Sequence, residues 1–336
     1  MAFFYEGDTI NEIFNKIYHS FETSKNITIP SQRGDTIEKL HSIISLHNPQ
    51  QRWLTIRKPS ISLAYVFAEL IILLSGNNEA KIINSWNPSL PKFQGDYQKY
   101  PGSYGNRLKY QFGFDQLEQA YSALLHEPSS RQIVLSIWKP DLDLPKTQGI
   151  PNSMDIPCNV ISMLKIRDNK LHWSQIMRSN DFYLGLPYDV ILFSLLQEVF
   201  AGWLEIELGE YSHFCDSLHY YVNKKMNIAE TDDSTFQIED LRLKKSEYDK
   251  AFPILYSYFT SLSDNEKVEN EVEMIINSPI TLPKSYDNIL MILCLYKSFK
   301  ETRNSNHFDI CMKRCSNELY KSLFINWMSE QKKDKE

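Results

Sequence analysis

Ile156-Pro157-Cys158-Asn159 opens the stretch of sequence around which the rest of the chain is arranged. The stretch continues through Met177-Arg178-Ser179-Asn180-Asp181-Phe182-Tyr183-Leu184-Gly185-Leu186-Pro187-Tyr188-Asp189 and ends with Asp216-Ser217-Leu218-His219-Tyr220-Tyr221. It holds a thiol, an arginine followed by a serine, carboxylates and a His-x-Tyr pair. Active sites use these residue types for nucleophilic and acid–base chemistry. We therefore expect a catalytic site to be built here.

A hairpin and a long helix are predicted within this stretch. Residues 160–166 and 171–177 have the composition of strands and flank a turn at 167–170, which predicts a β-hairpin. Between residues 188 and 204 apolar side chains occupy every side of a helix, so this helix should be buried and central. Helices packed against a sheet indicate an α+β fold.

The sequence upstream adds helices and one strand. Apolar residues recur at helical spacing between residues 9 and 48, on both sides of a polar loop at 30–36, and predict two helices. The apolar run 61–74 predicts another helix, and residues 114–125 a further one. Residues 131–138 are predicted to form a strand because of their β-branched side chains and their length.

Two charged residues upstream are candidates for function. Glu69 interrupts the apolar run, and burying an ionised carboxylate without a partner costs several kcal/mol. It is therefore either at a helix surface or held for proton transfer. Arg33 precedes a glycine in the polar loop, where it could grip a phosphate or simply be solvated.

After about residue 245 helical patterns recur without strands, at 249–262, 265–276, 285–300 and 308–329. We therefore expect a catalytic domain at 1–245 and a helical C-terminal extension at 246–336. Near its end, His307, Cys311 and Cys315 would share a helix face. Because a fourth ligand is lacking, we expect buried thiols there rather than a metal site.

Composition limits the classes of function. The 336 residues are 42% hydrophobic and carry a net charge of −6, so we expect no binding to duplex nucleic acid, although small anions remain possible ligands. The N-terminus lacks a signal-peptide pattern and no apolar run reaches membrane-spanning length, which predicts a cytoplasmic protein with no membrane contact. In that reducing compartment the five cysteines would be free thiols, and Cys158 becomes a candidate nucleophile.

These motifs together resemble the thymidylate synthase superfamily. The resemblance rests on Pro157-Cys158, the run from Arg178 to Pro187 and His219-x-Tyr221. Upstream matches follow in the same order and at similar spacing: Arg33-Gly34, Glu69, Tyr104-Gly105 and Ser130-Arg131. Several motifs in order over residues 33–221 make chance similarity a poor explanation. The resemblance implies the superfamily's fold, a sheet packed by helices around a central helix.

The resemblance also implies a role for each matching residue. Cys158 would add to C6 of a pyrimidine nucleoside monophosphate, so that C5 can attack the one-carbon unit of 5,10-methylenetetrahydrofolate. Glu69 would manage proton transfers, with Tyr104 assisting. The phosphate would be held by Arg33, Arg178, Ser179 and, from the partner subunit of a homodimer, Arg131. His219 and Tyr221 would bind the sugar hydroxyl, and the folate would face Asp181, Gly185 and Trp86.

One departure bears on the substrate. The superfamily's thymidylate synthases have asparagine where this chain has Asp189, because an amide can donate to uracil O4 and accept from N3–H. A carboxylate can instead accept from the N4 amino group of cytosine and from N3 once it is protonated. The same replacement marks the deoxycytidylate hydroxymethylases, which this chain resembles more closely. Alternatively, Asp189 only caps the central helix.

Other departures concern the product and the phosphate. Thymidylate synthases end in a short apolar tail that closes over folate, whereas this chain continues into its helical extension. Looser closure would let water rather than hydride complete the reaction, giving a hydroxymethyl product. Asn159 replaces a histidine that is common in the superfamily at this position, and Gln132 replaces a common second arginine.

We expect a folate-dependent C5-hydroxymethylase of a cytidine monophosphate. The alternatives are a thymidylate synthase that methylates deoxyuridylate, and a nucleotide-binding or assembly protein on this fold.

Overall fold

The computed structural model describes residues 2–23, 28–31, 34–229 and 238–333. Its main sheet runs in the order β1 (Phe3–Gly7), β3 (Thr36–Leu46), β9 (Glu207–Tyr221), β7 (Lys170–Met177), β6 (Asn159–Arg167) and β5 (Val134–Ser136). Two short strands join it, since β2 (Thr28–Ile29) pairs with β3 and β8 (Asn180–Asp181) with β9. Away from this sheet, β4 (Arg57–Lys58) pairs with β10 (Asn227–Ile228). The predicted α+β class is confirmed.

The β6–β7 hairpin has the predicted position. Its strands pair antiparallel from Asn159↔Met177 to Arg167↔Lys170. Asp168 and Asn169 form the turn with positive φ angles of 50° and 56°, a conformation that asparagine and aspartate tolerate and that suits a two-residue hairpin loop. The hairpin brings the segment that contains Cys158 beside the segment that contains Arg178.

The prediction of a second helix before residue 48 is wrong. Residues 36–46 form β3, which pairs antiparallel with β9 from Thr36↔Tyr221 to Leu46↔Tyr211. His41 has a φ of 57°, and neither it nor Leu40 is buried, whereas Lys39 and Ser42 are. The apolar residues of this strand differ in burial, since Ile44 and Leu46 are buried and Leu40 is exposed, and pairing with β9 overrides their helix-like spacing. The first predicted helix is present as α1 (Ile10–Thr23).

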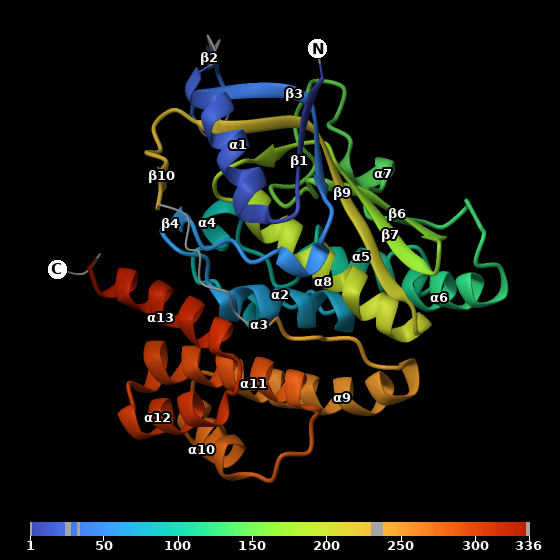
Figure 1. Cartoon of the computed structure of the whole chain (residues 1–336). Helices are drawn as coiled ribbons and strands as arrows, with labels where there is room; N and C mark the ends of the chain where they lie inside the picture. Colours follow the sequence, from blue (N-terminus) through green and yellow to red (C-terminus); the bar gives the residue numbers. More distant parts are fainter. Residues whose placement is uncertain (1, 24–27, 32–33, 230–237, 334–336) are drawn as a thin grey trace.

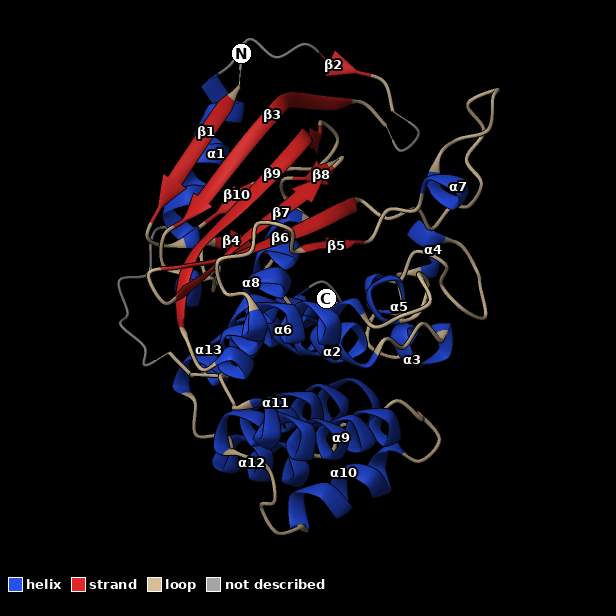
Figure 2. Ribbon diagram, turned by 90° about the vertical axis from the view of Figure 1, so that its right-hand side faces the viewer, coloured by secondary structure: helices blue, strands red, loops and turns tan. Residues whose placement is uncertain are grey.

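Helix α8 (Leu186–Leu204) is central, as predicted, and apart from Tyr188 and Asp189 all its residues are buried. It packs against β7 and β9 on one side and against α2 (Leu63–Ser75), α6 (Gln116–His126) and α9 (Lys245–Leu262) on others. Figure 2 shows this helical layer between the sheet and the C-terminal helices. Short helices complete the region: α3 (Ala80–Asn84), α4 (Pro91–Gln94), α5 (Tyr104–Lys109), α7 (Pro140–Asp143) and the 3-10 turn Pro49–Gln51.

The chain ends in a series of helices, all but the last of which lie below α2 and α8 in Figure 1, while the last, drawn in red, lies to the left of α2. They are α9 (Lys245–Leu262), α10 (Val268–Asn277), α11 (Lys284–Lys297), α12 (Ser305–Arg314) and α13 (Glu318–Lys333), with a π-helical turn at Ser298–Thr302. The segment predicted as one helix at 308–329 is divided between α12 and α13. Every residue of α11 after Lys284 is buried, and this helix packs on α2. In the part of the chain that the structure describes, no helix is both long and apolar enough to cross a bilayer.

Candidate active site

Cys158 and Arg178 meet at the open end of the β6–β7 hairpin. Cys158 precedes β6, Arg178 follows β7, and the pairing of Asn159 with Met177 places them side by side. The Nη2 atom of Arg178 lies 3.8 Å from Sγ of Cys158, and its Nε donates to the carbonyl of Pro157 over 2.9 Å. A cation beside a sulfur favours the anionic, nucleophilic form. The geometry thus suits Cys158 as a nucleophile.

Two carboxyl groups approach each other from apolar helices. Burial raises the pKa of Glu69 on α2 to about 8; a hydrogen bond with Tyr65 opposes the shift and the charge of Asp189 adds to it. Burial also raises the pKa of Asp189, in the first turn of α8, to about 7, against hydrogen bonds from Asn159 and Asn180. Both groups therefore hold a proton more tightly than ordinary carboxyls do, which suits acid–base catalysis near neutral pH.

Tyr104 connects these groups. It is the first residue of α5, and its ring centroid lies 6.1 Å from that of Phe193 on α8. Burial raises the pKa of its hydroxyl well above the ordinary value, the charges of Asp189, Cys158 and Glu69 raise it further, and a hydrogen bond from Asn159 opposes them. The structure therefore brings together the four residues predicted to be catalytic: Cys158, Glu69, Tyr104 and Asp189.

The residues expected at the phosphate and the sugar lie next to one another. Oγ of Ser179 is 3.4 Å from Nδ1 of His219. His219 and Tyr221 are two apart on β9 and so face the same side of the sheet, with ring centroids 5.5 Å apart and planes at 88°. Ser179 directly follows Arg178, so the sulfur, a cation and three polar side chains line one region.

The turn before α8 holds two of the residues expected to face folate. Oδ1 of Asp181 accepts from the backbone N–H groups of Tyr183 (2.8 Å) and Leu184 (2.9 Å), so Oδ2 is the oxygen that a ligand N–H can reach. A Cβ at Gly185 would lie 2.9 Å from Oδ1 of Asn180, so a side chain there would force that amide to move.

Trp86 has a different environment from the one expected. Its side chain is 2% exposed, stacks on Phe259 of α9 with centroids 5.2 Å apart and donates to Oγ of Ser263 over 2.9 Å. The ammonium of Lys297 lies 4.6 Å from the centre of its ring. The C-terminal extension thus covers Trp86, and its contact with folate stays a prediction that this packing does not favour.

Of the two phosphate-binding arginines predicted outside the central stretch, the structure describes Arg131. Arg131 is exposed at a surface hollow of about 610 Å³ lined also by Arg167. A role for Arg131 in a partner's site stays a prediction. Arg33 lies outside the described residues.

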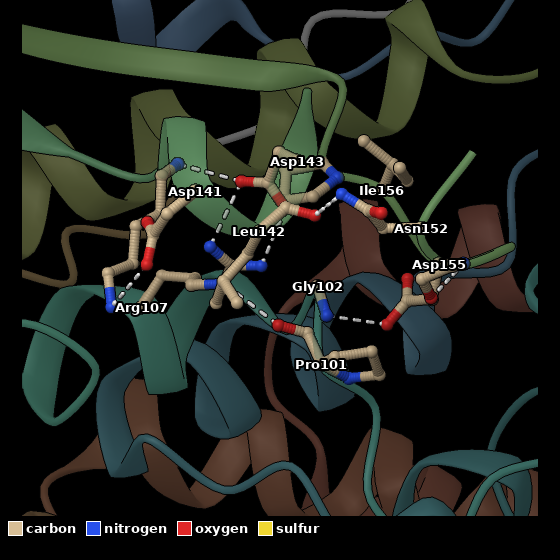
Figure 3. Close-up of polar contacts among 12 residues, drawn as sticks. Pro101, Gly102, Arg107, Asp141, Leu142, Asp143, Asn152, Asp155 and Ile156 are labelled. Carbon is tan, nitrogen blue, oxygen red and sulfur yellow. Dashed lines mark hydrogen bonds and ion pairs between the residues drawn. The ribbon is translucent and has the colours of Figure 1, made fainter. Parts of the chain in front are cut away.

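A polar network that the sequence did not reveal braces the segment leading to Cys158 (Figure 3). Arg107 of α5 forms two hydrogen bonds with Asp143, of 2.9 and 3.0 Å, and donates to the carbonyl of Pro101. A carboxylate oxygen of Asp155 accepts from the backbone N–H of Gly102 over 2.7 Å. These bonds tie residues 139–157 to the element that begins with Tyr104. Arg107 stands three residues after Tyr104, but sequence spacing carries no signal that its partner is Asp143.

Comparison with known proteins identifies the family. The family model described as thymidylate synthase matches residues 11–273, more than half of the chain. The chain belongs to the thymidylate synthase family. Enzymes of this family transfer a one-carbon unit to C5 of a pyrimidine nucleotide, and methylenetetrahydrofolate is their cofactor. Asp181 fits a folate ring, since its Oδ2 can accept from a ring N–H, and Gly185 adds no side chain beside it. Trp86 does not fit, because Phe259 covers it.

Among similar proteins, two bear the name deoxyuridylate hydroxymethyltransferase. The one from Bacillus phage SP01 is 28% identical over 65% of this chain and 59% of its own length. The one from Pseudomonas phage M6 is 25% identical over 79% of this chain and 76% of its own. Thymidylate synthase 1/2 of Encephalitozoon cuniculi is 30% identical over 43% of this chain and 42% of its own length. The match thus spans less than two thirds of the SP01 protein.

Proposed function

We propose that this protein hydroxymethylates C5 of a cytidine 5'-monophosphate, with either sugar, through a covalent bond between Cys158 and C6. The observation that carries the proposal is the carboxyl of Asp189, which lies within the catalytic cluster and accepts a hydrogen bond from Nδ2 of Asn159 over 3.2 Å. It occupies the place where an amide would read uracil. A role as a helix cap alone is not favoured, because the N-cap residue of α8 is Gly185, and Asp189 lies within the first turn with its carboxylate bonded to Asn159.

The chemistry of the residues gives a balanced first step. As Sγ of Cys158 bonds to C6, the electrons of the C5=C6 bond form C4=C5, and those of C4=N3 move to N3. The proton of Asp189 then passes to N3 and leaves a carboxylate. That carboxylate accepts from both N3–H and the N4 amino group, a charge-assisted pair. The pKa of about 7 makes the required proton available near neutral pH.

Glu69 and Tyr104 serve the later steps. Bound folate supplies the one-carbon unit that C5 receives. Glu69 holds a proton near neutral pH and can give it to the amine that leaves the one-carbon unit. As a carboxylate it can then accept the C5 proton. Tyr104 keeps its own proton because its pKa is raised, and its hydroxyl, hydrogen-bonded with Asn159, can assist this transfer. Addition of water to the C5 methylene group, followed by re-formation of C5=C6 and release of Sγ of Cys158 from C6, then gives the hydroxymethyl product.

A second candidate is hydroxymethylation of deoxyuridylate. It is favoured by the names of the two phage relatives. It is also compatible with the raised pKa of Asp189, because a protonated carboxyl can donate to O4 and accept from N3–H. In uracil, however, the electrons released by attack at C6 end on O4 and not on a ring nitrogen that takes a proton.

Substitution of Asp189 separates the two candidates. Asp189→Asn supplies an amide that suits uracil but has no acidic proton for N3. One such contact is worth about 1–3 kcal/mol, so the ratio of kcat/KM for deoxycytidylate to that for deoxyuridylate should fall roughly ten- to a hundredfold. Tritium release from C5 measures both rates. A wild-type preference for deoxyuridylate would favour the second candidate.

We also propose a homodimer, acting in the cytoplasm, in which Arg131 completes the phosphate site of the partner. Two observations support a partner. Arg131 is exposed and not built into its own chain's site. Phe4 on β1 and Val134 on β5 are 59% and 45% exposed, so apolar side chains lie on the outer face of the sheet. Light scattering gives the mass of the assembly.

A further inference from the structure

A series of hydrogen-bonded, buried polar side chains on β6 and β7 leads to Asp189. Asn159, Ser162, Trp173 and Gln175 are all 0% exposed. Nε1 of Trp173 (3.2 Å) and Oγ of Ser162 (2.6 Å) donate to Oε1 of Gln175. Nε2 of Gln175 donates to Oδ1 of Asn159 over 2.7 Å, and Nδ2 of Asn159 donates to Oδ1 of Asp189 over 3.2 Å.

The indole of Trp173 sets the direction of this series. An indole N–H can only donate, so the atom of Gln175 that faces it must be the oxygen. Gln175 must then present its NH₂ group to Asn159, which accepts with its own oxygen. Asn159 is left with its NH₂ group toward Asp189. The hydroxyl of Ser162 can either donate or accept, so it stabilises the series without setting its direction.

We propose that Trp173 and Gln175 are positioning residues, which fix Asn159 as a hydrogen-bond donor and thereby keep the acidic proton of Asp189 directed at the pyrimidine. The inference rests on the proposed function for the identity of the base. With Asn159 donating, Oδ1 of Asp189 acts as an acceptor on that side, and the proton is free to face the substrate. If the amide of Asn159 were reversed, its carbonyl oxygen would accept a hydrogen bond from the protonated carboxyl of Asp189, and the proton would then point away from the substrate.

Other groups around Asp189 do not replace this control. Asn180 adds a hydrogen bond that also lowers the pKa of Asp189. Electrostatic contact reaches Asp189 from Glu69 on α2, Tyr104 on α5, and Tyr211 and Cys215 on β9. These four are acids, which oppose its ionisation when they are charged. Loss of the bond from Asn159 should therefore raise the pKa of Asp189.

Gln175→Glu tests the direction. A carboxylate can still accept from Trp173 but can no longer donate, so the amide of Asn159 should turn and present its oxygen to Asp189. One hydrogen bond is worth about 1 kcal/mol, so the ionisation midpoint of Asp189 should rise by roughly one pH unit. The infrared carbonyl band of the protonated acid, identified by its loss in Asp189→Asn, follows that midpoint. The high-pH limb of kcat/KM should move with it, and kcat/KM should fall about tenfold.

Ser162→Ala is the matched control. It removes a hydrogen bond to the same oxygen of Gln175, but Trp173 still fixes the orientation of the Gln175 amide. Its midpoint should equal that of the wild type. Trp173→Phe keeps an aromatic ring but loses the N–H donor, so the ionisation midpoint of Asp189 should rise in this variant too. This second variant serves as the test if Gln175→Glu fails to fold. An unchanged midpoint in either variant, or an equal rise in Ser162→Ala, overturns the proposal. The infrared reading needs no turnover, so it stands even if the enzyme does not act on cytidylates.

Discussion

Glu69 and Asp189 extend into one site from two helices, α2 and α8, whose other residues are mostly buried and apolar. Their chemistry comes from that setting, since burial is the largest cause of the raised pKa of each. The sequence predicted Glu69 because a carboxylate in an apolar run is unusual, and Asp189 because it stands where the thymidylate synthases that the chain resembles have asparagine. It could not predict their neighbours Asn159 and Gln175, because polar residues on a strand look alike whether they face water or another side chain.

Cys158→Ala should abolish turnover while binding of deoxycytidylate changes less than about threefold. The phosphate and sugar contacts proposed for Arg178, Ser179 and His219 do not involve the sulfur, whereas every step after binding needs the bond from Sγ to C6. Product formation and calorimetric titration with deoxycytidylate measure the two effects. Cys315→Ala is a control thiol, because Cys315 is fully buried at the end of α12 in the C-terminal extension. Turnover near the wild-type rate in Cys158→Ala would contradict the assignment.

Glu69→Gln should stabilise the protein increasingly as the pH rises from 5 to 8. The pKa of Glu69 is about 8 in the folded protein against 4.5 as the ordinary value, so between these pH values the unfolded chain loses a proton that the folded protein keeps. Folding stability therefore falls over this range, and glutamine removes the fall. We expect a gain in Tm of a few °C at pH 8, measured by calorimetry, and a smaller one at pH 5. Glu266→Gln, on the surface, should show no such trend.

At the scale of elements, local patterns predicted the β6–β7 hairpin and α8 but not β3. The hairpin has its turn residues Asp168 and Asn169, and α8 is apolar on every side, so each is determined by its own sequence. The segment 36–46 becomes a strand because β9 pairs along its length, a partner about 175 residues away. Its neighbour β9 itself was not predicted. The same long-range pairing positions His219 and Tyr221.

Arg107→Met should destabilise the protein by about 3–5 kcal/mol, because it leaves the carboxylate of Asp143 buried without its cation. Arg107 and Asp143 are 1% and 2% exposed. Adding Asp143→Leu should recover most of the loss, since the charge is then gone. Urea unfolding measures both variants, and kcat should fall in the single variant because α5 carries Tyr104. Asp141→Asn is the control, since its pair with Lys139 is exposed and should contribute under about 1 kcal/mol. A loss in the double variant as large as in the single one would contradict this account.

At the scale of the whole molecule, mixing two inactive variants tests the shared site. If Arg131 serves the partner's phosphate, Arg131→Ala and Cys158→Ala subunits should each be inactive or slow alone. Their hybrid dimer has one site with both residues intact, so mixing after unfolding and refolding should restore up to about a quarter of the wild-type activity when half of the dimers are hybrids. Arg167→Ala, at the same surface hollow, is a useful comparison. An Arg131→Ala enzyme with wild-type KM, or an active monomer, would exclude the shared site.

The helices of the extension were predicted, but their packing was not. Helical spacing reveals that a segment has an apolar face and says nothing of which surface the face meets. Here α9 and α11 cover Trp86, and the ring of Tyr320 on α13 lies 5.3 Å from that of Trp53 and 5.1 Å from that of Phe67. The proposed boundary near residue 245 therefore divides the chain but not its hydrophobic core.

That continuity predicts a single unfolding transition for the catalytic region and the extension together. Tyr320 is fully buried between α13 and α2, so Tyr320→Ala should cost about 3–5 kcal/mol and lower one common Tm. Ile325→Ala on the same helix is the control, because that side chain is 41% exposed and its loss should shift Tm little. Calorimetry and hydrogen exchange of α2 and α8 measure the effect. Two separate transitions, with Tyr320→Ala moving only one of them, would mean that residues 246–336 are an independent domain. A single shifted transition means that the extension replaces solvent over α2, and that the position of Glu69 depends on it.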